Sequence, residues 1–252
     1  MIDARRIEEA GLNALQTQRQ LFYDGWLLRV SPGKARRARS VNAYFGSSLP
    51  LDVKIDHCER IYAERELPTL FRITPFVAPA NLERALLARG YAPFDTTLVQ
   101  ALELDGTALP APARGAVELV EASVDAFVDA IGMLRQSSAL QRDAHRERLG
   151  HSPLDGRHVL ALLDGVAVGA GKTAREGDIV GVFDVVTAEH ARGRGIATLL
   201  VARLLARAWD RGARLAYLQV EAGNAPALAI YRRLGFTTLY TYHYCAREGV
   251  SP

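Results

Sequence analysis

The chain has 252 residues, which is enough for one large domain or two small ones. Hydrophobic residues make up 49% and charged residues 23%, a composition typical of a globular protein rather than a disordered one. No apolar run approaches the ~20 residues of a membrane-spanning helix. The polar start also lacks the apolar core of a signal peptide, so we expect a cytoplasmic protein without membrane contact. A net charge of +3 does not by itself indicate nucleic acid, but it suits an acidic ligand.

The first half is predicted to alternate short helices and strands. Helices are expected over 2–22, 51–65 and 80–89, and strands over 25–30, 38–44, 69–74 and 96–104. The basic run from Lys34 to Arg39 is interpreted as a solvated hairpin edge, with contact to an acidic ligand or substrate as the first alternative. Nucleic acid is the second and weaker alternative, because the run lacks interleaved aromatic residues. Residues 105–115 contain two prolines and two glycines and are the best candidate for a linker.

The second half predicts helices between strands in the order β-α-α-β-β-β-α-β-α-β. The strands are expected over 117–121, 157–163, 166–173, 179–187, 215–221 and 237–246, and the helices over 124–135, 140–149, 195–211 and 225–234. This alternation indicates an α/β fold with a mixed central sheet.

A weak internal repeat links the two halves. In 81–91 and again in 227–236, a helical pattern ends at a glycine followed by an aromatic residue, and a β-rich segment follows. The N-terminal half is therefore interpreted as a truncated relative of the C-terminal half, with two unrelated helix-glycine-strand units as the alternative.

The segment 185–198 carries the main chemical signal. An apolar strand ends, a polar loop with Gly193 and Gly195 follows, and an amphipathic helix begins. The first amides of a helix have no intrahelical partner and lie at the positive end of its dipole. Arg192 and Arg194 add positive charge, so this loop suits a pyrophosphate group.

Two motifs resemble those of the GNAT N-acetyltransferases. The sequence Arg192-x-x-Gly195-x-Ala197 is similar to the (Q/R)xxGx(G/A) coenzyme A signature. Asn224, Tyr231 and Gly235-Phe236 then follow with the spacing of the N-x-x-A-x-x-x-Y-x-x-x-G-F segment. The resemblance covers about 130 residues and implies an acyl-CoA N-acyltransferase fold, with acetyl-CoA as co-substrate.

The resemblance also implies which residues hold acetyl-CoA. Val185 and Val186 would pair with the pantetheine arm as an added strand, and Asn224 would contact the same arm. The pyrophosphate would lie on the loop and first helical turn formed by Arg192, Gly193, Arg194, Gly195, Ile196, Ala197 and Thr198.

Acyl transfer to an amine needs an acid for the leaving thiolate and a base for the ammonium proton. Tyr231 is predicted to be the acid. In a branch of the family a glutamate five residues before the asparagine is the base, but Gln219 occupies that position here. Asp184 is the first candidate base and Glu221 the second, with water as the remaining alternative, and His243 is interpreted as structural.

These features predict a degenerate GNAT-like domain over 1–108 and a catalytic GNAT domain over 116–252. The expected function is transfer of acetyl from acetyl-CoA to a primary amine by direct attack in a ternary complex. The alternative is a degenerate acyl-CoA-binding regulatory module. Cys58 and Cys245 lack metal-ligand spacing, so we expect buried thiols and no metal site.

Overall fold

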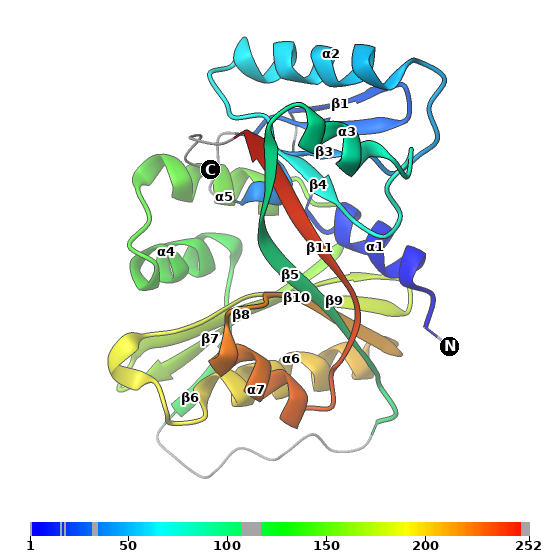
Figure 1. The fold of residues 1–252 in the computed structure, drawn as a ribbon. Coiled ribbons are helices and arrows are strands. Elements are labelled where there is room, and N and C mark those ends of the chain that lie inside the picture. Colours follow the sequence, from blue (N-terminus) through cyan, green and yellow to red (C-terminus); the bar gives the residue numbers. More distant parts are fainter. Residues whose placement is uncertain (1, 16, 18, 32–34, 107–116, 248–252) are drawn as a thin grey trace. The chain divides into compact units, whose positions relative to one another are not determined.

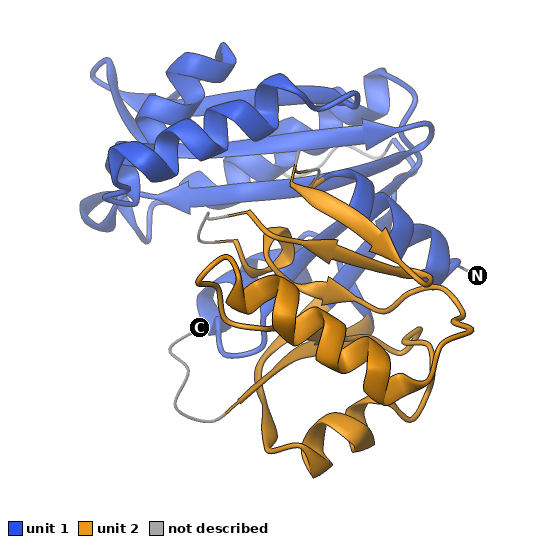
Figure 2. Ribbon diagram, turned by 90° about the horizontal axis from the view of Figure 1, so that it is seen from above, with its two compact units in different colours: residues 1–14, 99–239 blue, residues 15–98, 240–252 orange. Residues whose placement is uncertain are grey.

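The computed structural model describes residues 2–15, 17, 19–31, 35–106 and 117–247. Contacts divide the chain into two compact units, coloured separately in Figure 2. Unit 1 contains residues 1–14 and 99–239, and unit 2 contains residues 15–98 and 240–252. The units therefore differ from the two continuous halves expected from the sequence. The predicted linker lies, from residue 107 onward, outside the described residues.

Unit 1 contains the segment order predicted for the second half of the sequence (Figure 1). Its elements are α1 (Ala4–Asn13), the end of β5 (Tyr91–Glu103), β6 (Val117–Glu121), α4 (Val124–Leu134), α5 (Ala139–Gly150), β7 (Asp155–Leu163), β8 (Val166–Glu176), β9 (Ile179–Thr187), α6 (Ile196–Asp210), β10 (Leu215–Glu221), α7 (Ala225–Arg233) and the start of β11 (Thr237–Arg247). The strand order is β5-β10-β9-β8-β7-β6. β9 and β10 are parallel, whereas β6, β7, β8 and β9 form antiparallel neighbours, so the sheet is mixed as predicted.

Helices cover both faces of this sheet. Successive side chains of a strand point to opposite faces, so each face has apolar side chains to bury against a helix. On one face, Phe127 and Ile131 of α4 pack with Leu160 and Ala170 of the sheet. On the other, Leu200 of α6 approaches Gly169, where an added Cβ would lie 3.0 Å from its methyl group. Small residues on this face thus let α6 lie close to the sheet.

Unit 2 is built from β1 (Gln20–Tyr23), β2 (Trp26–Arg29), the 3₁₀ turn η1 (Arg36–Ala38), β3 (Val41–Asn42), α2 (Leu51–Ala63), β4 (Phe71–Ile73), α3 (Leu82–Ala88), most of β5 and the end of β11. The strand order is β1-β2-β3-β4-β11, with β3 and β4 parallel and β4 and β11 antiparallel. The fully buried Trp26, Tyr62 and Phe71 centre its core.

Two predictions for the first half are wrong. The helix expected over 2–22 ends at Asn13, because Gln20–Tyr23 pairs with Trp26–Arg29 across the Asp24-Gly25 turn. The basic run is not a hairpin edge: residues 36–38 form η1, and Arg36 is half-buried with its guanidinium 2.6 Å from Asp95. Lys34 lies outside the described residues. In the described part of the chain, no helix combines the length and apolarity needed to span a membrane.

Candidate active site

The glycine-bearing loop leads from β9 into α6 as predicted. Gly193 and Gly195 have φ values of 78° and 76°, in the left-handed region that favours glycine. Gly195 caps the N-terminus of α6, and a Cβ built at either glycine would meet no atom within 4 Å. Arg192 and Arg194 are exposed beside it. The loop thus offers first-turn amides, positive charge and open space, which fits a pyrophosphate.

β9 and β10 diverge next to this loop. Their parallel pairs run from Ile179 with Leu215 to Val182 with Leu218, although β9 continues to Thr187 and β10 to Glu221. The backbone of β9 after Val182 therefore has an edge that faces away from β8. An extended arm placed along Val185 and Val186 would find main-chain donors and acceptors there.

A β-bulge lies in the same part of β9. Ala170 pairs with Val186 and Lys172 with Phe183, so Asp184 and Val185 together face Gly171 of β8. Asp184 adopts a φ of 56°, which is uncommon for a residue other than glycine. The bulge turns its side chain out of the regular alternation and toward a group of basic side chains.

Three side chains from other elements converge on Asp184. Its carboxylate lies 2.9 Å from Arg135 at the end of α4, 3.2 Å from Nε2 of His145 on α5, and 4.0 Å from Lys172 on β8. Burial alone would raise the pKa of Asp184, but the hydrogen bond from His145 and the charges of Lys172 and Arg135 hold it well below its usual value. A carboxylate with so low a pKa is a weak base, which argues against the general-base role predicted for Asp184.

These partners could not be predicted from the sequence, because Arg135, His145 and Lys172 lie far from Asp184 in the chain and follow no local spacing. His158 on β7 pairs across strands with Lys172. Burial and the charge of Lys172 lower its pKa to about 4, so its imidazole is neutral at physiological pH.

Tyr231 lies on α7, half-buried, with its ring centroid 6.0 Å from that of Phe236. Burial raises the pKa of its phenol, which is therefore protonated at neutral pH, as an acid must be. Asn224 is the N-cap of α7, and its side-chain oxygen accepts from the amide of Ala227. This cap occupies the oxygen but leaves the side-chain amide group to donate.

The two remaining candidates on β10 differ in exposure. Gln219 is half-buried, and its Nε2 lies 2.9 Å from where a Cβ on Gly11 of α1 would stand. Glu221 is exposed at the end of the strand, next to the turn that leads to Asn224.

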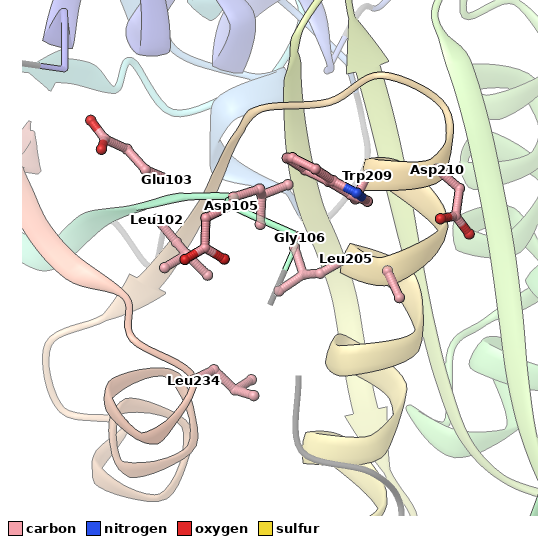
Figure 3. A pocket seen from close by; sticks show the side chains of 10 residues that line it. Leu102, Glu103, Asp105, Gly106, Leu205, Trp209, Asp210 and Leu234 are labelled. Atoms are coloured by element: carbon pink, nitrogen blue, oxygen red, sulfur yellow. The ribbon is translucent and has the colours of Figure 1, made fainter. Parts of the chain in front are cut away.

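A cavity of about 250 Å³ lies at the other end of α6 (Figure 3). Its lining includes the carboxylate residues Glu103, Asp105 and Asp210 together with Trp209. The guanidinium of Arg214 stacks over the Trp209 ring, 3.8 Å from its centre, so this ring face is occupied by a residue of the protein itself. Acidic groups disfavour a polyanion, so this cavity does not suit coenzyme A.

The fold is that of the GNAT N-acetyltransferase family, and comparison with known proteins agrees. A family model described as "Probable histone acetyltransferase Rv0428c C-terminal" matches residues 2–245. The chain therefore belongs to this family, within the GNAT N-acetyltransferases.

Two relatives resemble the chain over nearly its whole length, and a third over four fifths of it. An uncharacterized N-acetyltransferase of Bacillus subtilis, YobR, is 24% identical over 257 residues, covering 97% of this chain and 98% of the relative. A GCN5-related N-acetyltransferase from Kribbella flavida superposes with a TM-score of 0.74 at 21% identity, covering 99% of this chain and 97% of that one. A tandem GNAT protein from the clavulanic acid biosynthesis pathway has a TM-score of 0.65 at 18% identity, covering 80% and 70% respectively. The two structural likenesses show the fold.

Proposed function

We propose that this protein transfers the acetyl group of acetyl-CoA to a primary amine. The observation that carries the proposal is the loop from Arg192 to Thr198, which presents helix amides and open space beside the diverging strands β9 and β10. Acetyl-CoA supplies an activated acyl carbon and a thiolate leaving group. Holding both reactants in one site supplies several kcal/mol of the rate enhancement in such reactions.

Direct attack by the amine is favoured over a covalent enzyme intermediate. Burial raises the pKa of the Cys58 and Cys245 thiols to about 12, so neither is a thiolate at neutral pH. Both also belong to unit 2, whereas the loop belongs to unit 1. The described part of the chain thus offers no activated cysteine for a two-step route.

Tyr231 is proposed to donate its phenolic proton to the departing sulfur. Its raised pKa keeps that proton in place until charge develops on the sulfur. The ammonium proton of the acceptor passes to Glu221 or to water, because Asp184 is held as a stable anion by the charges of Arg135 and Lys172 and by its contact with His145. Asp184 instead fixes the ends of α4 and α5 against the bulge of β9.

Release of free CoA thiol, measured with a panel of amines, tests the proposal. The panel should include amino acids, polyamines, aminoglycosides, and peptides with a free N-terminus or a lysine side chain. Lysine peptides are included because the matching family is described as a probable histone acetyltransferase. Amine-dependent release is expected with at least one class.

A regulatory acyl-CoA-binding module is the second candidate, favoured by Gln219 at the position where a branch of the family has a glutamate base. Tight acetyl-CoA binding with no thiol release above the hydrolysis background, across the whole panel, would support the module and contradict the enzyme.

A further inference from the structure

Three potential metal ligands converge in unit 2. Oε1 of Glu83 and Nε2 of His243 are 2.9 Å apart, and Sγ of Cys245 completes a group whose ligand atoms all lie within 4.8 Å of one another. The hydrogen bond between Glu83 and His243 joins two of these groups. The Cys245 thiol lies beside this pair and supplies the third potential metal ligand.

The local structure explains why these side chains meet. His243 and Cys245 are two residues apart on β11, so they lie on the same face of the strand. Both lie in the stretch of β11 that pairs with β4, which fixes their register. Glu83 is in the first turn of α3, whose Leu82 and Leu86 belong to the same core as Cys245.

The three groups form a gradient from solvent to core. The side chain of Glu83 is 40% exposed and that of His243 24%, whereas Cys245 is fully buried. An ion can therefore approach from the Glu83 side and keep a water molecule as its fourth ligand. A soft sulfur, an imidazole nitrogen and a carboxylate oxygen form a donor set suited to Zn²⁺.

We propose that Glu83, His243 and Cys245 form a zinc-binding site that ties α3 to β11. On binding, the Cys245 S–H bond breaks, its proton passes to solvent and the sulfur bonds to the metal. The proton that Nε2 of His243 donates to Glu83 passes to solvent while Nδ1 carries the proton of the neutral ring, so that Nε2 and the carboxylate can each bond to the metal.

Cobalt(II) is the probe, because a thiolate bound to it gives a near-ultraviolet charge-transfer band and tetrahedral coordination gives strong visible bands. The full chain, without a histidine tag, is titrated with Co²⁺ and then with Zn²⁺. We expect both sets of bands to saturate at one Co²⁺ per chain and to disappear as Zn²⁺ is added.

Two serine variants separate this site from a chance contact with a thiol. Cys245→Ser should lose the charge-transfer band, whereas Cys58→Ser, which removes the other buried thiol of the same core, should keep it. Glu83→Gln keeps the core thiol and alters a partly exposed group, so it tests the site even if Cys245→Ser unfolds. It should weaken Co²⁺ binding by ~10-fold or more, as changes around metal ligands commonly do.

An ion pair above an inert core thiol is the competing interpretation. It would be established by a wild-type chain that shows no charge-transfer band at millimolar Co²⁺. A band that survives in Cys245→Ser, or an unchanged affinity in Glu83→Gln, would equally overturn the zinc site.

Discussion

Asp184 shows at the scale of one residue how charge and backbone geometry combine. Its carboxylate is 22% exposed and contacts groups from α4, α5 and β8. Removing one partner of such a group leaves the others uncompensated, so Asp184→Asn should lower the free energy of unfolding by roughly 2–3 kcal/mol. Chemical denaturation at pH 7 measures this.

The pH dependence of that loss has a definite sign. Because the pKa of Asp184 in the folded state lies below its usual value of 3.8, its stabilisation is complete at neutral pH. The stabilisation disappears as the pH falls below about 4 toward the folded-state pKa, so the variant and the wild type should converge only in acid. Asp164→Asn is a matched control, because Asp164 also has a positive φ of 51° but lies exposed in a hairpin turn.

The same variant decides whether Asp184 is a base. If it were, raising the pH would restore the rate of Asp184→Asn, since the amine would lose its proton unaided. We expect a lower rate that alkaline pH does not restore, because the defect lies in the placement of α4 and α5. The sequence identified Asp184 as a carboxylate among apolar neighbours, but only the fold could show that distant residues supply its partners.

Tyr231 was predicted from its spacing after Asn224, and its role is tested by removing one oxygen. Tyr231→Phe should reduce turnover by ~10²-fold, the usual range for losing a general acid. Affinity for acetyl-CoA should be unchanged, because the phenol matters only once charge develops on the sulfur. Thermal unfolding should also be unchanged, since the ring still packs against Phe236. Near-normal turnover on a true substrate would exclude the acid role.

At the scale of elements, the loop between β9 and α6 is the critical feature. Gly195→Glu places a carboxylate beside the pyrophosphate position and strains a backbone with a φ of 76°. We expect at least a ~10²-fold loss of acetyl-CoA affinity by calorimetry, as close like charges cost several kcal/mol.

Gly165→Glu is its matched control. Gly165 has a φ of 78° and equally open surroundings, but it lies in the hairpin turn between β7 and β8. The control should carry the same strain and retain affinity. Equal affinity in both folded variants would remove the basis for assigning the loop to acetyl-CoA.

Elements were predictable where the local pattern agrees with the tertiary structure. The bounds of β6, β9 and β10 match the prediction. β9 and β10 are largely apolar runs that follow glycine-containing turns, whereas β6 is a short segment that ends just before the helix cap Ser123. Gln20–Tyr23 was mistaken for helix because its strand depends on pairing with β2. The bulge at Asp184 was also unpredictable, since it depends on the register between β8 and β9.

At the scale of the whole molecule, the two units repeat one chain order. β3-α2-β4-α3-β5 in the first part corresponds to β9-α6-β10-α7-β11 in the second, and in each the two strands flanking the longer helix are parallel. The final strand of each series contributes residues to both units. The repeat could be predicted from the similar sequences at α3 and α7. The sharing of β5 and β11 between the two units could not, because it leaves no local pattern in the sequence.

The loop before α2 is the counterpart in unit 2 of the loop before α6, and it differs in chemistry. The carboxylate of Asp24 accepts hydrogen bonds from the amides of Ser48 and Leu49 and from the Ser48 hydroxyl. These amides lower the pKa of Asp24, and Lys54 lies 3.2 Å from the same carboxylate. An internal anion thus occupies two loop amides just before α2, where it would repel a pyrophosphate.

We therefore expect one acetyl-CoA per chain, bound by unit 1. Isothermal titration calorimetry of the full chain should give a stoichiometry of one, and Gly195→Glu should abolish all measurable binding. If unit 2 also bound acetyl-CoA, the wild type would take up two equivalents and Gly195→Glu would retain one. The variant therefore separates a single site from a pair of sites even if their affinities in the wild type are too similar to resolve. Retention of one tight site in Gly195→Glu would show that Asp24 does not block unit 2, and that the first part of the chain still binds the co-substrate.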